Sequence, residues 1–519
     1  MIRYACVAGL FFTCGLPVFP QQQHRPPAAP PAAGTASPQA AGEQKAPAPP
    51  PVEKLSTTKH TVPIDGKPVN YTATAGTMVL RKEDGTAIAS MFFVAYVQDG
   101  VTDIARRPIT FAYNGGPGSS AVWLQMGALG PMRVLMNAQG QALAPPYKLV
   151  DNEFSILDLT DLVFIDPVGT GYSRAAPGQD PKEFYGITGD TESMGNCIRE
   201  YCTRYARWAS PKFLAGESYG TTRSAALSGY LQQRVGMNLN GIVLVSSILN
   251  FETVAFHSGN DLPYILYLPT YAAAAWYHKK LPKDLQANRE KAIEEARQFA
   301  ATDYTLALMK GSSLAPAERT RIVQKLARYT GLSPEYIERS NLRVSNQHFM
   351  KELLRNEDLI IGRYDSRITG IDQDAVASSP EYDPSYTVVQ GPFTAVWNQY
   401  VRTELKFETD LTYEILTGRV QPWNYGQYQN RYVNVADTLS QAMAQNPALK
   451  VFVANGYYDL ATPFFATQYT FDHMGLAPSV RGNLSMDYFD AGHMMYTQLA
   501  SLEKLKRDLA QFIASAVPK

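Results

Sequence analysis

The sequence has few cysteines, and they do not form the pattern of a metal site. Its 519 residues contain four cysteines, without a C-x-x-C pair or a zinc-type spacing of cysteine and histidine. Cys6 and Cys14 lie near the N-terminus. Cys197 and Cys202 are five residues apart in an expected helix, where their side chains point in different directions. We therefore expect no metal, no cofactor and no structural disulfide.

An excess of charge of either sign is also missing. Lys and Arg together number 47, as do Asp and Glu, so the formal net charge is zero. A protein without a general basic field is not drawn to nucleic acid or to an anionic membrane surface. The sequence therefore predicts that any partner is recognised at a specific site.

The N-terminal apolar run is too short to cross a membrane comfortably. In residues 1–20, MIRYACVAGLFFTCGLPVFP, Arg3 precedes this run, which is the layout of a secretory signal peptide. We expect export to the periplasm or the extracellular space, with no membrane span after the signal is removed. Lipid attachment at Cys14 is less favoured, because the bulky Phe11 and Phe12 precede it.

Large apolar side chains are almost missing from the next segment. Residues 21–54 begin QQQHRPPAAPPAAG and are dominated by proline and alanine. Such a composition buries too little surface to offset the entropy that is lost when the chain is ordered. We predict a disordered linker over 21–54.

The rest of the chain alternates between strand and helix patterns. Short apolar runs such as PITFAYNGG and DLVFIDPVGTG end in glycine-rich loops, which is typical of buried parallel strands. Helical segments alternate with these runs, so we predict an α/β fold with a mostly parallel central sheet and helices on both faces. This rhythm holds over 55–250 and returns over 447–519, whereas helical segments dominate 251–446 and predict a helical cap insertion. In the last helix, five apolar residues at helical spacing are expected to pack on the sheet: Leu502, Leu505, Leu509, Phe512 and Ile513.

One serine lies in a pattern typical of a nucleophile. Residues 216–220, GESYG, place Ser218 between two glycines, directly after the apolar run FLA. The pattern G-x-S-x-G marks a sharp turn from strand to helix that lifts the serine oxygen out of the sheet. Chance alone places this pattern in roughly one chain in six of this length, given the ordinary frequency of glycine. The surrounding sequence therefore has to show whether Ser218 is a nucleophile.

Two further residues complete a predicted catalytic group. A serine nucleophile needs a histidine as base and a carboxylate that orients the histidine, in the chain order Ser, Asp or Glu, then His. His493 lies where the strand SMDYF ends, and Asp459 lies where the strand KVFVANGYYD ends. We predict Asp459 as the acid. Asp490 is the rival, and we expect it to stabilise its own turn.

The chemistry also needs an oxyanion hole, which consists of two N–H donors aimed at the developing negative oxygen. One donor is the backbone N–H of Tyr219, the residue after the nucleophile. The other is expected from the glycine-rich loop YNGGPGSS, residues 113–120. An ordinary Gly-Pro turn would explain these glycines, but it would not explain their place in the chain order.

Five motifs resemble those of a known enzyme family. NGGPGSS, FIDPVGTGYS, GESYG, NGYYD and AGH are similar in order and spacing to the motifs of the serine carboxypeptidase family, the carboxypeptidase Y-like branch of the α/β-hydrolase fold. The chain resembles a bacterial-type member over residues 55–519. The resemblance implies an exported enzyme that hydrolytically removes single residues from the free C-termini of peptides and proteins.

The resemblance also implies roles for individual residues. Ser218, Asp459 and His493 correspond to the catalytic triad of the family. The backbone N–H groups of Gly116 and Tyr219 correspond to its oxyanion hole.

Two further residues correspond to those that bind the terminal carboxylate of the substrate, Asn114 and Glu217. A carboxyl group beside a carboxylate donates a hydrogen bond only while it is protonated, and such crowding raises its pKa. The resemblance therefore implies activity that favours acidic pH.

Three positions depart from the family pattern. Ser119 stands where a disulfide cysteine is usual, Tyr113 replaces a tryptophan, and Ala128 in ALGP replaces a carboxylate. The last departure leaves Glu217 without a second carboxyl neighbour, which weakens the expectation of an acidic optimum.

Two alternative functions stay open. An esterase, aminopeptidase or acyltransferase could use the same triad, since the fold and the triad do not determine the substrate. A non-catalytic binding protein, presented on the proline-rich segment, could keep the scaffold. The complete set of triad residues argues against the second alternative.

Overall fold

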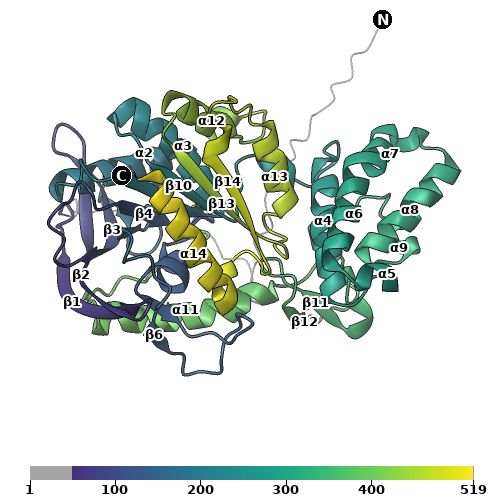
Figure 1. The fold of residues 1–519 in the computed structure, drawn as a ribbon, viewed down its shortest axis with the longest axis horizontal. Coiled ribbons are helices and arrows are strands. Elements are labelled where there is room, and N and C mark those ends of the chain that lie inside the picture. The colour runs from purple at the N-terminus through teal and green to yellow at the C-terminus, as the bar shows by residue number, and fades with distance from the viewer. Residues whose placement is uncertain (1–48, 518–519) are drawn as a thin grey trace, which may run out of the picture. The chain divides into compact units, whose positions relative to one another are not determined.

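The computed structural model describes residues 49–517, and most of them surround one central sheet (Figure 1). The signal peptide expected over 1–20 and nearly all of the linker expected over 21–54 lie outside the described residues. The sheet runs β1-β2-β3-β7-β4-β9-β10-β13-β14, and β8 pairs with β3. Its strands are β1 (Leu55–Ile64), β2 (Lys67–Arg81), β3 (Ala87–Gln98), β4 (Ile109–Tyr113), β7 (Asp161–Ile165), β8 (Arg174–Ala175), β9 (Lys212–Glu217), β10 (Gly241–Val245), β13 (Lys450–Gly456) and β14 (Leu484–Phe489).

Six neighbouring strands, from β7 to β14, are parallel, whereas β1, β2 and β3 join the sheet as antiparallel strands. The strands β4, β7, β9 and β10 are buried along their whole length, because helices cover both faces. This confirms the predicted α/β fold with a mostly parallel sheet.

Fourteen α-helices surround or extend this sheet within residues 49–517. They are α1 (Val122–Leu124), α2 (Ile187–Arg204), α3 (Tyr219–Tyr230), α4 (Leu262–Tyr277), α5 (Lys283–Gln286), α6 (Arg289–Phe299), α7 (Thr305–Lys310), α8 (Pro316–Thr330), α9 (Pro334–Arg339), α10 (Asn346–Glu352), α11 (Pro384–Thr403), α12 (Ala436–Gln445), α13 (Phe464–His473) and α14 (Leu499–Ala516). Two short hairpins complete the fold, β5 (Met132–Val134) with β6 (Leu149–Asp151), and β11 (Leu359–Ile361) with β12 (Thr369–Ile371).

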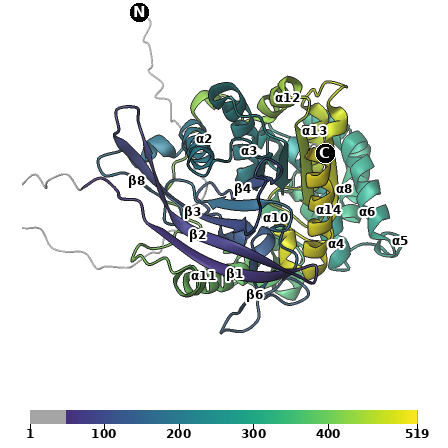
Figure 2. The ribbon, with the colours of Figure 1, turned by 60° about the vertical axis from the view of Figure 1, so that its left-hand side comes forward.

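Two apolar cores lie on opposite faces of the sheet. Successive residues of β9 enter different cores, Phe213 on one face and Leu214 on the other, as the alternation of a strand requires. The helices α2, α3 and α12 cover one face, whereas α11 and α14 cover the other (Figure 2). The five apolar residues predicted in the last helix all pack in the core under α14, which confirms their predicted orientation.

A third core belongs to the helical insertion. Residues of α4, α6, α8 and α10 pack on one another in a cluster that extends from Tyr267 to Ile361 and also includes Leu460. Helix α4 contacts α13 at the edge of the sheet (Figure 1). The predicted 251–446 insertion also contains α11 and α12, whose apolar faces pack on the sheet instead. Only the first part of that range therefore forms a core of its own.

The described residues carry neither a membrane-spanning helix nor a disulfide. None of the helices within 49–517 combines the length and the apolarity that a bilayer crossing requires. Cys197 and Cys202 are free and buried in α2.

Candidate active site

Ser218 occupies a strained turn between β9 and α3. Its φ of 59° and ψ of −129° lie outside the regions that non-glycine residues usually adopt. The flanking glycines make this turn sterically feasible. A Cβ on Gly216 would lie 2.2 Å from the carbonyl oxygen of Gly220, and a Cβ on Gly220 would lie 2.9 Å from that of Tyr113. The local sequence GESYG therefore folds into the sharp turn that its pattern predicts.

Asp459 and His493 meet at the carboxyl ends of β13 and β14. Asp459 Oδ2 lies 2.7 Å from His493 Nδ1, and both side chains are buried. Asp459 also accepts hydrogen bonds from the N–H groups of Ala461 (2.7 Å) and Thr462 (3.0 Å) and from the Thr462 hydroxyl (2.7 Å). Burial acts to lower the pKa of His493, but the Asp459 carboxylate and Glu217 raise it above its ordinary value.

The rival acid points elsewhere. The side chain of Asp490 is 65% exposed and pairs with Arg289 of α6. The structure therefore brings Asp459, and not Asp490, to the imidazole of His493.

Ser218 and His493 line one cavity together with the glycine-rich loop. Among the described residues, no hydrogen bond joins the Ser218 hydroxyl to His493, a contact that often tightens only in complexes with substrate. Gly115 brings the loop against the start of α3, since a Cβ there would lie 2.3 Å from the Tyr219 nitrogen. The loop turns at Gly116, where φ is 100°. Two stretches of backbone, at Gly116 and Tyr219, thus flank Ser218.

Two buried polar groups face the same cavity without a partner. Asn114 is 1% exposed; its Oδ1 accepts the N–H of Leu124 at 3.0 Å, while its Nδ2 has no hydrogen-bond partner among the described residues. Glu217 is 4% exposed, and its Oε2 is likewise unpartnered within that part of the chain. Burial raises the pKa of Glu217 to about 7, against the opposing effect of His493. Below about pH 7 the site therefore offers an amide N–H donor and, from the protonated carboxyl, an O–H donor.

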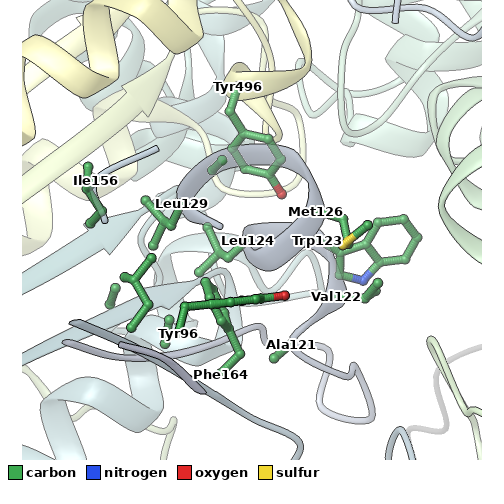
Figure 3. Close-up of a cluster of buried hydrophobic side chains, with 14 of the residues drawn as sticks. Tyr96, Ala121, Val122, Trp123, Leu124, Met126, Leu129, Ile156, Phe164 and Tyr496 are labelled. Carbon is green, nitrogen blue, oxygen red and sulfur yellow. The ribbon is translucent and has the colours of Figure 1, made fainter. Parts of the chain in front are cut away.

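Tyr496 is a third buried polar group, beside Glu217, and no pattern in the sequence pointed to it. Its phenol is buried, has no partner among residues 49–517 and lies beside Glu217. Burial raises the pKa of the phenol well above its ordinary value, so it stays protonated. The ring lies over the turn that contains Ala128, where a Cβ on Gly127 would meet it at 2.5 Å (Figure 3). A phenol thus accompanies Glu217, and its ring packs against Gly127, the residue before Ala128.

Arg223 holds the site from the protein interior, and no sequence pattern pointed to it. This side chain on α3 is 1% exposed, pairs with Asp190 at 2.7 Å and donates to the carbonyl oxygen of Asn114. Its guanidinium also lies over the rings of Tyr113 and Tyr219, at 5.3 and 5.4 Å. Arg223 therefore ties the glycine-rich loop to the helix that follows Ser218.

The described residues offer no evident metal centre. No group of three or more His, Cys, Asp or Glu side chains within 49–517 is placed to hold a metal ion. What this arrangement can do chemically is activate a serine oxygen beside donors for a negatively charged group.

Comparisons with known proteins bear on the family and the fold of the chain. The family model described as serine carboxypeptidase matches residues 63–504. Serine carboxypeptidase-like 50 of Arabidopsis thaliana is 26% identical over 254 residues, which are 48% of this chain and 50% of that protein. The lysosomal protective protein of Mus musculus is 25% identical over 185 residues, 34% of this chain and 35% of that protein. The chain thus spans half, or less, of the length of these relatives.

A solved structure supports the fold. Kex1, a prohormone-processing carboxypeptidase from Saccharomyces cerevisiae, matches with a TM-score of 0.53 and 18% identity, over 86% of this chain and 91% of that one. At this identity the match shows a common α/β-hydrolase fold.

The raised pKa of Glu217 predicts a pH-dependent gain in stability for Glu217→Gln. With a pKa of about 7 in the folded state and an ordinary value of 4.5, wild-type stability falls as pH rises from 4.5 and levels off above 7. Glutamine cannot ionise, so the variant should gain up to about 3 kcal/mol relative to wild type across that interval. Denaturant unfolding at a series of pH values measures this difference. Glu192→Gln, at an exposed position of α2, is the control. Parallel curves for wild type and Glu217→Gln would contradict the prediction.

Proposed function

Because the chain belongs to the serine carboxypeptidase family, we propose that it removes single residues from the free C-termini of peptides through an acyl-enzyme on Ser218. The observation that carries this proposal is the pair of unpartnered buried groups, Asn114 Nδ2 and Glu217 Oε2, in the cavity that Ser218 lines. A site for ester hydrolysis alone needs no such donors. A site that must hold a terminal carboxylate beside the nucleophile needs both.

The proposed reaction begins with proton transfer. His493 Nε2 takes the proton of Ser218 while Oγ attacks the carbonyl carbon of the last peptide bond, and Asp459 stabilises the imidazolium that forms. The negative oxygen of the tetrahedral intermediate accepts hydrogen bonds from the backbone N–H groups of Gly116 and Tyr219. Each such donor is worth about 3 kcal/mol of transition-state stabilisation.

The second half of the reaction restores the enzyme. The imidazolium of His493 gives its proton to the leaving amine, the C–N bond breaks, and the freed amino acid departs with its amino group. A water molecule then loses a proton to His493 and attacks the acyl-enzyme. Collapse of the second intermediate returns the proton to Ser218 Oγ and releases the shortened peptide.

Recognition of the terminal carboxylate depends on protonated donors. In this proposal Asn114 Nδ2 and the protonated Glu217 donate to the carboxylate oxygens, and burial keeps Glu217 protonated although the neighbouring Tyr496 phenol acts to lower its pKa. A substrate without a free carboxylate leaves both donors unpaired in a buried site, which is costly. This cost favours carboxypeptidase over aminopeptidase or general esterase activity.

We also propose that the enzyme acts outside the cytoplasm. The support is the charged N-terminus with Arg3 followed by a short apolar run. The alternative of a non-catalytic binding protein is disfavoured by the Asp459–His493 hydrogen bond, which binding alone does not require.

Labelling with a fluorophosphonate tests the nucleophile. Wild-type protein should react covalently at Ser218 and shorten peptides by one C-terminal residue at a time, as followed by mass spectrometry. Ser218→Ala should do neither, because the variant lacks the hydroxyl that the proposed reaction uses as its nucleophile. Ser119→Ala, which removes a hydroxyl that lines the same cavity without facing a base, should still be labelled. An unlabelled wild type would favour the binding-protein alternative.

Asn114→Ala tests carboxylate recognition. Loss of a hydrogen bond to a charged group should raise KM for peptides with a free C-terminus by about 10-fold or more. An ester without a carboxylate should be hydrolysed with an unchanged KM. An equal loss on both substrates would count against the proposed role of Asn114.

The pH dependence of KM tests Glu217. Above its pKa of about 7 the carboxyl group loses its proton and repels the substrate carboxylate, so wild-type KM for peptides should rise with pH. Glu217→Gln keeps an N–H donor at every pH, and its KM should stay flat across the same range. Steady-state kinetics from pH 5 to 9 measures both. If the variant followed the wild-type rise in KM, Glu217 would not be the titrating group.

A further inference from the structure

The loop between β11 and β12, residues 362–368, belongs to the insertion but reaches the candidate active site. It lies against two segments, the one that follows β13 and carries Asp459, and the one that follows β14 and carries His493. These two segments contain the acid and the base of the proposed triad. The contacts of the 362–368 loop with each of them are specific and are made at the catalytic residues or next to them.

The 362–368 loop holds Asp459 from both sides. The N–H of Leu460 donates to the carbonyl oxygen of Arg363 at 2.9 Å. On the other side, the N–H and the hydroxyl of Ser366 both donate to the carbonyl oxygen of Tyr458 at 3.0 Å. The residue before Asp459 and the residue after it are therefore both attached to the same loop.

The same loop holds His493 through Tyr364. The N–H of His493 donates to the carbonyl oxygen of Tyr364 at 2.6 Å, and the two rings stack with centroids 5.0 Å apart and an angle of 16° between their planes. The approach is so close that a Cβ on Gly492 would lie 2.2 Å from that carbonyl oxygen. Arg367 adds a hydrogen bond to the carbonyl oxygen of Asp490 at 2.7 Å.

The loop is itself anchored to the start of α11. The N–H of Arg363 donates to Asp383 at 3.0 Å, and the N–H of Tyr364 donates to the Ser385 hydroxyl at 2.9 Å. Within the loop, Arg367 makes two hydrogen bonds to the carboxylate of Asp365, at 2.9 and 2.6 Å. The loop is thus held in place without relying on the residues of the triad.

We infer that the 362–368 loop positions the proposed triad, and that Tyr364 fixes the plane of the His493 imidazole. The inference rests on the proposed function, because it concerns a residue that acts through the catalytic base. The hydrogen bond to Asp459 fixes one ring nitrogen, but the ring can still tilt about that contact. The stacked ring of Tyr364 blocks this tilt and keeps Nε2 aimed at Ser218. A misplacement of about 1 Å in such a group costs about 100-fold in rate.

The groups that set the titration of His493 are few. Asp459 and Glu217 are the acids near the imidazole, and Arg363 is the nearby cation, with its guanidinium over the Tyr364 ring at 4.9 Å. The Thr462 hydroxyl is the remaining polar contact, at 3.2 Å from Nδ1. Without the Tyr364 ring the imidazole can tilt away from Asp459. Its pKa should then fall back towards the ordinary value of histidine. The rise of kcat with pH, which follows the deprotonation of His493, should then occur at lower pH.

The test compares three substitutions at Tyr364 in the full chain. With a small ester substrate, Tyr364→Ala should lower kcat by about 100-fold and move the rising limb of the pH profile to lower pH. Tyr364→Leu fills most of the same volume without an aromatic face and should show the same loss. Tyr364→Phe keeps the stacked ring and the backbone contact and should retain most of the activity. Tyr382→Ala is the control, since Tyr382 is exposed and bonds to Ile371 of β12 rather than to the triad segments.

The outcomes separate the inference from the proposed function. If fluorophosphonate labels Ser218 as fast in Tyr364→Ala and Tyr364→Leu as in wild type, the positioning role is wrong and the triad stands. If both variants lose activity only in proportion to a lower melting temperature, with an unmoved pH profile, Tyr364 is merely structural and the inference is again overturned. If the wild type is not labelled, the proposed function itself fails.

Discussion

The buried hydrogen bond between Asp459 and His493 is the contact on which the proposed chemistry depends. A buried carboxylate is costly unless its oxygens are hydrogen-bonded. Asp459 meets this requirement with two backbone N–H groups and the Thr462 hydroxyl in addition to the imidazole. The sheet makes the contact possible, because β13 and β14 pair in parallel and in register up to Gly456 and Phe489. The loops that follow the two strands therefore begin side by side, although Asp459 and His493 are 34 positions apart in the sequence.

Close approach of backbone segments is the second constraint. Around Ser218, a Cβ on Gly115, Gly216 or Gly220 would clash with backbone atoms. The reason is that the glycine-rich loop, the strained turn and the start of α3 are in contact through their main chains. Such contacts bring N–H groups within reach of a reacting oxygen without the freedom of a side chain. Arg223 holds the arrangement from the interior by bonding both to Asp190 and to the carbonyl oxygen of Asn114. The strained backbone of Ser218 could therefore relax only if the glycine-rich loop, the end of β9 and the start of α3 moved together.

The sequence could predict what depends on local pattern, and it could not predict which side chains tertiary packing brings to the site. Buried parallel strands have continuous apolar runs, so the fold class, the turn at Ser218 and the strand ends near His493 could be located. Tyr364, Tyr496 and Arg223 have no such signal. Tyr364 reaches the site from a hairpin in a helical region, Tyr496 follows the base as one of 31 tyrosines, and Arg223 has the appearance of an ordinary helical arginine. Their positions follow from tertiary packing between segments far apart in the sequence.

The environment of Glu217 shows how a departure from the family pattern can be accommodated. A neighbouring carboxylate raises the pKa of a carboxyl group by repulsion, but burial has the same effect by removing water from the charged form. Here Ala128 is buried in an apolar turn, and burial is the largest cause of the raised pKa of Glu217. The Tyr496 phenol beside it stays neutral and acts to lower the pKa of Glu217, and burial outweighs this effect. A buried carboxyl group without a second carboxylate beside it can thus still present a protonated donor below about pH 7.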